Sequence, residues 1–164
     1  MYRVGILTAS DKGAAGQRED LSAAVIREMV EARGWRVESY RIVPDDLDTI
    51  RDALIDMADR EKLDLVLTTG GTGFSPRDNT PEATRSVIQR EAPGIPEVMR
   101  AESLKKTPRA MLSRATAGIR KATLIINLPG SRKAVRECLE AIIDSLPHGL
   151  EILTGRGGEC GHGL

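Results

Sequence analysis

The chain has 164 residues, of which 40% are apolar, so it is long enough for one domain with a substantial core. Its 24 basic and 24 acidic side chains cancel, which argues against a nucleic-acid partner bound chiefly through its phosphate backbone. Aromatic residues are scarce, which predicts an aliphatic core and no stacking platform for single-stranded nucleic acid.

Nothing in the sequence predicts a membrane segment or a secretory signal. No apolar run approaches the roughly 20 residues of a membrane-spanning helix, and the N-terminus leads directly into a predicted strand. Cys138 and Cys160 stand far apart, without the spacing of a disulfide framework or a metal site. We therefore expect a cytoplasmic protein.

The first predicted elements are a strand, a loop and a helix. Residues 3–9 (RVGILTA) are rich in strand formers. Ser10 and Asp11 follow at the carboxyl end of this strand, where open α/β sheets bind ligands. Asp11 could equally hold the turn by bonding its own backbone. A mobile loop is expected up to residue 20, and apolar residues at three- and four-residue spacing predict a helix over residues 20–34.

A second strand, residues 35–43, is followed by Pro44 and another predicted helix. Asp45 stands at the start of this helix, where acids favour the N-terminus through capping and the macrodipole. Asp46 and Asp48 could cap the helix equally well. Capping by one of these two acids would leave Asp45 available for a different role.

The stretch DLVLTTGGTGFSPRDNTPEAT, residues 64–84, predicts a buried strand joined to a helix by a glycine-rich turn. Gly70, Gly71 and Gly73 permit backbone angles that a Cβ forbids, and they let the main chain approach a ligand closely. Successive N–H groups in such a turn can bind phosphate oxygens. An ordinary tight connection would explain the glycines alone. The trailing Asp78 and the neighbouring hydroxyl groups favour a site for phosphate or a hydrated metal.

After this turn, Thr80 is the predicted N-cap of a helix over residues 81–91. Residues 95–105 are predicted to form another helix, and residues 108–119 to be irregular or a short helix. A buried strand is predicted over residues 121–127 (KATLIIN).

The step Gly130-Ser131 then opens a helix whose first N–H groups lack internal partners, which makes an anion site. Residues 150–153 are expected to form a last short strand. The glycine-rich end of the chain contains Cys160 and His162, which are too few ligands to predict a zinc site.

The alternation of strands and helices predicts an α/β fold with a mostly parallel sheet. Residues 1–154 are expected to form a single domain, and residues 155–164 a flexible tail. Three strand ends carry polar or glycine chemistry, and in a parallel sheet these ends meet along one edge. Glycine turns suit phosphates, and carboxylates suit Mg²⁺. The residues alone therefore predict a phosphate or nucleotide site with Mg²⁺, without a defined reaction.

Two stretches, TTGGTGFSPRDNTPEAT and MLSRATAGIRKATLIINLPGS, closely resemble the molybdopterin adenylyltransferase family, which includes the bacterial MogA type and gephyrin G domains. The resemblance runs from about Arg3 to Leu153. It implies a three-layer α/β sandwich that assembles as a homotrimer, with a hexamer possible, and a partner protein that inserts molybdate. The implied reaction transfers AMP from ATP to the terminal phosphate of molybdopterin and releases pyrophosphate. The alternative is a non-catalytic pterin-binding or assembly protein of the MoaB branch.

The resemblance also implies roles for individual residues. The family's essential pair of acids falls on Asp45 and Asp78, which are implied to be catalytic and to hold hydrated Mg²⁺ against the triphosphate. Arg77 is either a charge clamp or a solvated loop arginine. The residues implied to bind substrate or nucleotide are Ser10, Asp11, Gly70, Gly71, Thr72, Gly73, Pro129, Gly130 and Ser131.

Overall fold

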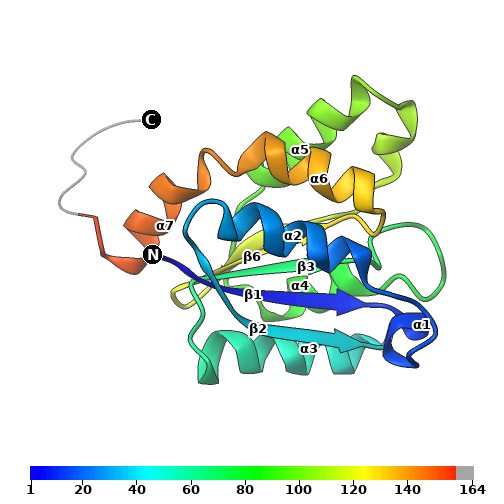
Figure 1. The fold of residues 1–164 in the computed structure, drawn as a ribbon, viewed down its shortest axis with the longest axis horizontal. Helices are drawn as coiled ribbons and strands as arrows, with labels where there is room; N and C mark the ends of the chain where they lie inside the picture. The colour runs from blue at the N-terminus through cyan, green and yellow to red at the C-terminus, as the bar shows by residue number, and fades with distance from the viewer. Residues whose placement is uncertain (158–164) are drawn as a thin grey trace.

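In a computed structural model that describes residues 1–157, a six-stranded sheet forms the centre of the molecule (Figure 1). Its strand order is β2-β1-β3-β6-β5-β4. The four strands β2, β1, β3 and β6 are parallel, whereas β5 runs antiparallel to both of its neighbours. The strands are β1 (Arg3–Ala9), β2 (Arg36–Val43), β3 (Leu65–Thr69), β4 (Arg90–Glu91), β5 (Ala117–Arg120) and β6 (Thr123–Leu128).

Helices cover both faces of this sheet, so the fold has three layers (Figure 1). One face carries α2 (Leu21–Glu31), α5 (Gly94–Leu104), α6 (Arg132–Ile142) and α7 (Leu146–Thr154). The other face carries α3 (Leu47–Ile55) and α4 (Thr80–Val87). Shorter helical segments are α1 (Asp11–Ala14), the π-helical continuation of α3 (Asp56–Arg60) and a 3-10 helix (Pro108–Leu112). The predicted three-layer sandwich with a mostly parallel sheet is confirmed.

Strand alternation divides the core into two clusters, one on each face of the sheet. In β1, Val4 and Ile6 pack toward α2 and α6, while Leu7 packs toward α3. The strands β3 and β6 alternate in the same way, and both are buried along their whole length. Both clusters are dominated by aliphatic side chains. Aliphatic packing on both faces holds the parallel strand ends in register.

Two parts of the second half differ from the sequence-based prediction. The helix predicted over residues 81–91 ends at Val87, because Ile88 is extended and the Gln89 N–H donates to the Ile119 carbonyl at 2.8 Å. Residues 90–91 then pair with β5 as a short edge strand. Residues 108–119, predicted to be irregular or a short helix, contain the 3-10 helix Pro108–Leu112, but the prediction missed β5, because its pairing is formed by residues distant in sequence.

The strand predicted over residues 150–153 is wrong, because these residues belong to α7. Leu146 and Leu150 lie four residues apart and are buried on one side of this helix. Gly155 ends α7 in a left-handed conformation with φ of +69°. Residues 158–164, with Cys160 and His162, lie outside the described residues.

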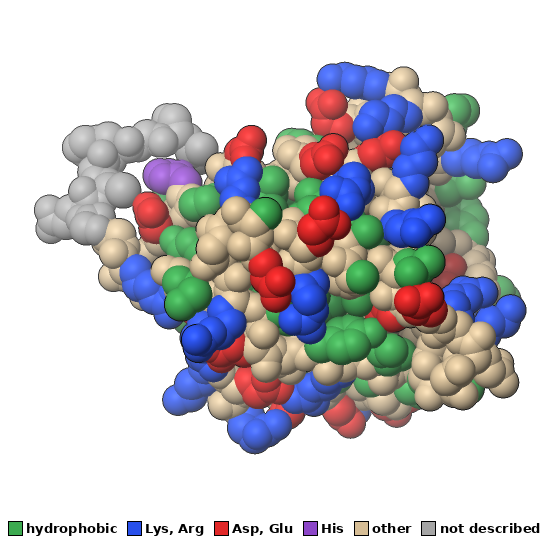
Figure 2. Space-filling view, in the orientation of Figure 1, with side chains coloured by type: hydrophobic (Ala, Val, Ile, Leu, Met, Phe, Trp, Pro, Cys, Tyr) green, Lys and Arg blue, Asp and Glu red, His purple; other side chains and the backbone are tan. Residues whose placement is uncertain are grey.

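The carboxyl ends of the parallel strands lie together at the right of Figure 1, opposite the N-terminus and α7. Basic and acidic side chains are mixed over the face shown in Figure 2, in keeping with the cancelling charges of the chain. Within residues 1–157, no helix combines the length and the apolar character needed to cross a bilayer. The polar residues at the carboxyl ends of the parallel strands are where we look for a functional site.

Candidate functional site

A cavity of about 650 Å³ opens where the carboxyl ends of β1 and β3 meet the first residues of α2 and α6. Its lining is polar and comes from segments far apart in the sequence. The structure brings both implied catalytic acids into this lining, together with several of the residues implied to bind substrate. These are Ser10, Asp45, Gly70, Gly71, Asp78, Gly130 and Ser131.

The glycine turn forms the floor of this cavity and packs tightly against the neighbouring strand ends. Gly70 and Gly71 have φ of +90° and +70°, which only glycine adopts without strain. A Cβ at Gly70 would overlap the Ala9 carbonyl oxygen, and one at Gly71 would overlap Thr80 Oγ1. A Cβ on Gly130 would lie 3.4 Å from Gly70 Cα. The backbone itself is therefore exposed to any ligand in the cavity.

Asp45 does not cap the helix that follows it. The Asp46 carboxylate accepts the Thr49 N–H at 2.9 Å and caps α3, as the sequence allowed. The Asp45 carboxylate instead accepts the Asp11 N–H at 2.9 Å through Oδ2. Burial raises the pKa of Asp45, the bond from Asp11 opposes this shift, and repulsion from Asp11 and Asp78 adds to it. Asp45 is a partly buried acid whose charge is incompletely compensated.

Asp78 is held by a turn at the far end of the glycine-rich loop. Its Oδ2 accepts the Ser75 N–H at 3.0 Å and lies close to Gly73, where a Cβ would approach it to 2.9 Å. Asp78 Oδ1 and Asp45 Oδ1 accept no hydrogen bond from the described residues. Each acid thus has an oxygen that is free to bind a cation.

These two carboxylates fit Mg²⁺ on the chemistry of the donors. Mg²⁺ usually binds through one or two carboxylates together with waters and substrate phosphates. In the described part of the chain, no three side chains of His, Cys, Asp or Glu form a cluster that could hold a metal. Waters and phosphate oxygens would therefore complete the coordination around Asp45 and Asp78. A cation here would favour the ionised form of Asp45, whose pKa is raised by burial and, to a smaller extent, by repulsion from Asp11 and Asp78.

Asp11 and Arg77 lie beside the cavity and form an ion pair. The Arg77 guanidinium donates from Nε and Nη2 to the two oxygens of Asp11, both at 2.9 Å. This pair holds the pKa of Asp11 below its ordinary value. Asp11 was implied to bind substrate, but its side chain is exposed and occupied by Arg77 and the Asp45 backbone. Its contacts fit a role in holding Asp45 better than direct ligand binding.

Hydroxyl groups fix the loop after β6 against the other strand ends. Ser22 donates to the Gly130 carbonyl at 2.7 Å, and Thr69 donates to the Pro129 carbonyl at 2.7 Å. Ser131 caps α6 by accepting the Ala134 N–H at 3.2 Å. The N-terminus of α6 consequently faces the cavity, where the helix dipole favours an anion.

Two arginines in the cavity lining were not identified from the sequence. Arg18 comes from the loop before α2, and Arg132 is the first residue of α6. Neither forms an ion pair within residues 1–157. The position of Arg132 directly after a predicted anion-binding step was the available signal. The sequence gave no comparable signal for Arg18, because nothing in its loop indicated that the loop folds toward the sheet edge.

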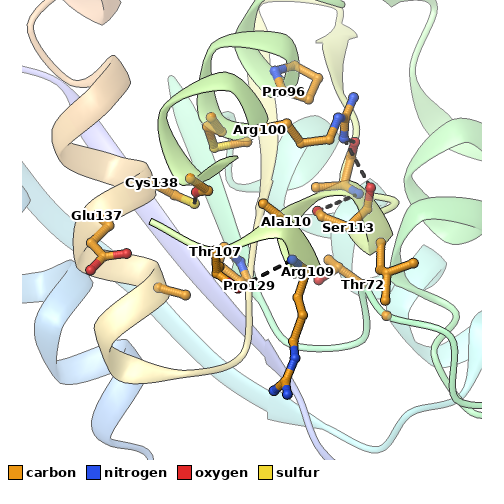
Figure 3. A pocket seen from close by; sticks show the side chains of 16 residues that line it. Thr72, Pro96, Arg100, Thr107, Arg109, Ala110, Ser113, Pro129, Glu137 and Cys138 are labelled. Atoms are coloured by element: carbon orange, nitrogen blue, oxygen red, sulfur yellow. Dashed lines mark hydrogen bonds between the residues drawn. The ribbon is translucent and has the colours of Figure 1, made fainter. Parts of the chain in front are cut away.

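A second, smaller cavity of about 290 Å³ adjoins the glycine-rich loop and the loop after β6 (Figure 3). Thr72, Gly73 and Pro129, implied to bind substrate, line this cavity and not the larger one. Residues of α5, α6 and the 3-10 helix complete a mostly apolar wall. The Arg100 guanidinium lies in this lining and donates a hydrogen bond to the Ala115 backbone carbonyl at 3.0 Å (Figure 3). The site is thus a polar cavity and an apolar cavity separated by two loops.

Residues 5–148 match the family model described as "Probable molybdopterin binding domain". The chain belongs to this molybdopterin-binding family. A molybdopterin adenylyltransferase of Helicobacter pylori J99 is 47% identical, over 93% of this chain and 88% of the relative. The molybdopterin adenylyltransferase of Escherichia coli K12 is 37% identical, over 93% of this chain and 86% of the relative.

Solved structures of the family agree with this fold. The molybdopterin biosynthesis enzyme MoaB of Thermus thermophilus superposes with a TM-score of 0.90 at 54% identity, over 94% of this chain and 98% of that one. The molybdopterin biosynthesis Mog protein of Mycobacterium ulcerans superposes with a TM-score of 0.88 at 37% identity, over 93% of this chain and 99% of that one. Both branches of the family are therefore represented among the similar structures.

Proposed function

We propose that the protein is a molybdopterin adenylyltransferase in molybdenum cofactor biosynthesis, which transfers AMP from Mg-ATP to the terminal phosphate of molybdopterin. The observation that carries the proposal is the position of Asp45 and Asp78 in one polar cavity, beside the glycine turn and the N-terminus of α6. The names of the relatives from H. pylori and E. coli support the same activity. The products are adenylylated molybdopterin and pyrophosphate.

The larger cavity suits the nucleotide. Arg18 and Arg132 supply positive charge, and the α6 N-terminus and the Gly70–Gly71 backbone supply N–H groups for phosphate oxygens. Asp45 and Asp78 would hold Mg²⁺, which neutralises charge on the triphosphate when it is bound. In this arrangement the α-phosphorus of ATP lies near the two loops that separate the cavities.

The smaller cavity suits a flat heteroaromatic ring, whose faces can pack against the mostly apolar wall. Thr72 and Pro129 line it, while their chain neighbours, Gly71 and Gly130, line the larger cavity. A pterin held here would direct its side-chain phosphate across these loops toward the nucleotide. The short connection between the cavities supports reaction between two ligands bound at the same time.

The proposed transfer needs little acid or base catalysis. A terminal phosphate oxygen attacks the α-phosphorus of ATP, and the bond to the bridging oxygen breaks as pyrophosphate leaves with that electron pair. A phosphate monoester is already largely ionised near neutral pH, since its second pKa is about 6. The protein contributes position and charge neutralisation, through its acids, its arginines and the glycine-turn N–H groups.

The resemblance to the family supports further proposals about assembly. We infer a homotrimer, with a hexamer as the alternative, a cytoplasmic location, and a partner protein that inserts molybdate into the product. Size measurement in solution by light scattering tests the first of these. A monomer at micromolar concentration would contradict it.

The second candidate is the alternative that the resemblance leaves open, a non-catalytic pterin-binding or assembly protein of the MoaB branch. Mixing the protein with molybdopterin, ATP and Mg²⁺ and measuring pyrophosphate separates the two. Release of pyrophosphate that requires molybdopterin supports the transferase. Tight pterin binding without pyrophosphate supports the carrier, and ATP binding without pterin binding contradicts both.

A further inference from the structure

Arg114 connects to both ends of the loop that carries Gly73 and Asp78. Its guanidinium donates from Nε to the Gly73 carbonyl and from Nη2 to the Asp78 carbonyl, both at 2.8 Å. Its backbone N–H donates to the Thr72 carbonyl at 2.9 Å. A single residue from the segment before β5 thus closes the loop of residues 72–78 into a ring of hydrogen bonds.

The third arm of the guanidinium fixes Arg114 to the following helix. Nη1 forms an ion pair with Glu82 in the first turn of α4. Arg114 binds Glu82 through Oε1, while Glu82 Oε2 is buried and has no hydrogen-bond partner in the described chain. With acceptors in all three directions, the planar guanidinium has one favourable orientation.

The position of Asp78 depends on this ring. Among residues 1–157, the Ser75 N–H is the donor to its carboxylate, and Ser75 belongs to the same loop. No hydrogen bond from another element of the described chain holds the side chain itself. The loop backbone therefore decides where the carboxylate lies. The Arg77 side chain ties this loop to Asp11, whereas Arg114 binds the backbone itself, at the carbonyl groups of residues 72, 73 and 78.

The same residue lies at the boundary between the two cavities. Its neighbour Ser113 lines the apolar cavity together with Thr72 and Gly73, whereas Asp78 lines the polar cavity. The bonds from Arg114 to Gly73 and Asp78 therefore join the walls of both cavities. A shift of this loop would change the distance between ligands bound on its two sides.

We propose that Arg114 is a positioning residue for adenylyl transfer, which holds the Asp78 carboxylate and the Thr72–Gly73 backbone in register between the two cavities. The proposal rests on the proposed function for its kinetic consequence, but its effect on Asp78 can be measured separately. Lysine cannot replace Arg114, because an ammonium cannot reach Gly73, Asp78 and Glu82 in one planar fork.

The test compares Arg114→Ala and Arg114→Lys with Arg120→Ala. Arg120 is a matched control, because its guanidinium also makes three bonds, to both Asp59 oxygens and to the Val87 carbonyl, but it lines neither cavity. Mn²⁺ affinity is measured by calorimetry in the presence of a non-hydrolysable ATP analogue. Kinetic constants are measured for the same three variants.

We expect both Arg114 variants to bind Mn²⁺ about 10–100-fold more weakly and to lose kcat by a similar factor, as for other residues that support a metal ligand. The KM for molybdopterin should stay within about threefold, and Arg120→Ala should match the wild type in every constant. Millimolar guanidinium should partly restore kcat in Arg114→Ala. Wild-type Mn²⁺ affinity in Arg114→Ala, or an equal loss in Arg120→Ala, would overturn the proposal.

Amide hydrogen exchange supplies a readout that does not depend on activity. Residues 73–79 should exchange faster in Arg114→Ala than in the wild type and in Arg120→Ala, because the ring of hydrogen bonds is open. Unchanged exchange there would contradict the role of Arg114 even in an active enzyme. An inactive wild type would contradict the proposed function, while exchange and Mn²⁺ affinity would still decide the role of Arg114.

Discussion

Asp11 and Asp45 each accept a hydrogen bond from the other's backbone N–H group. The Asp45 N–H donates to Asp11 Oδ1 and the Asp11 N–H donates to Asp45 Oδ2, both at 2.9 Å. This reciprocal pair closes the loop after β1 onto the loop after β2. Arg77, from the loop after β3, donates two hydrogen bonds to the Asp11 carboxylate. Three strand ends are thereby linked around one carboxylate, that of Asp45.

Removal of the Asp11 side chain should impair catalysis more than ATP binding. Asp11→Ala deletes the acceptor of the Asp45 N–H and releases Arg77, so the backbone that carries Asp45 loses an anchor. We expect kcat to fall about 10–100-fold, with the KM for ATP within a few-fold. Asp48→Ala is the control, because Asp48 is exposed and pairs with Arg51 on the same helix. Equal kcat for Asp11→Ala and wild type would show that Asp45 needs no such support.

Asp45→Asn should stabilise the metal-free protein while abolishing turnover. The pKa of Asp45 is raised in the folded state, mainly by burial, so ionisation costs stability as pH rises through that pKa. Asparagine removes this cost and can still accept the Asp11 N–H. We expect the melting temperature in EDTA at pH 7 to rise by about 2–4 °C. This gain should shrink as pH falls and wild-type Asp45 takes up its proton.

Asp46→Asn is the matched comparison, because the pKa of Asp46 is shifted in the opposite direction from that of Asp45. Hydrogen bonds from the Thr49 side chain and backbone lower the pKa of Asp46, so its ionised form stabilises the fold above the ordinary aspartate pKa. Neutral asparagine still caps α3 but loses the charge contribution. The melting temperature should therefore stay level or fall slightly at pH 7. A lower melting temperature for Asp45→Asn than for Asp46→Asn would refute the assigned burial effect.

Glycine substitutions should separate a required backbone conformation from an incidental one. Gly70→Ala introduces a Cβ at φ of +90° against the Ala9 carbonyl oxygen, so the free energy of unfolding should fall by about 2 kcal/mol or more. Gly149→Ala lies inside α7 with nothing within 4 Å of the new Cβ. It should raise the free energy of unfolding by up to ~1 kcal/mol through helix propensity. Urea denaturation of both variants measures the difference.

Arg132 should contribute to ATP binding and not to the chemical step. It lines the polar cavity without an ion-pair partner in the described chain, whereas Arg136, one turn further along α6, pairs with Glu28. Arg132→Ala should raise the KM for ATP about tenfold, the equivalent of ~1.4 kcal/mol, and leave kcat near the wild-type value. Arg136→Ala should leave both constants unchanged. Identical KM values in the two variants would remove Arg132 from the nucleotide site.

Locally encoded features could be predicted from the sequence. The continuous apolar run of β3 and the glycines after it predicted both a buried strand and its turn, and Ser131 caps α6 as its residue type predicts. The sequence left Asp45, Asp46 and Asp48 as alternatives for capping α3, and the structure shows that Asp46 is the cap. Thr80 shows the limit of such reasoning, because Asn79 occupies the cap position and the Thr80 hydroxyl has no partner in the described chain.

Features that depend on long-range pairing could not be predicted in this way. The edge strands β4 and β5 exist because residues 90–91 meet residues 118–119, and neither segment carries a local strand signal. The loop before α2 was expected to be mobile throughout, but it begins with α1, capped by Ser10. Similarly, the contact between Asp11 and Asp45 exists only after β1 and β2 have paired. The second cavity likewise requires α5 and α6 to pack together, so it has no signature in either segment alone.

The most direct measurement of the central claim is a crystal structure with Mn²⁺ and a non-hydrolysable ATP analogue, in which the metal is located by its anomalous scattering. Our account predicts one strong peak between the Asp45 and Asp78 carboxylates, with the triphosphate along the glycine turn. A metal and triphosphate bound at any other place, with both carboxylates left to solvent, would contradict it.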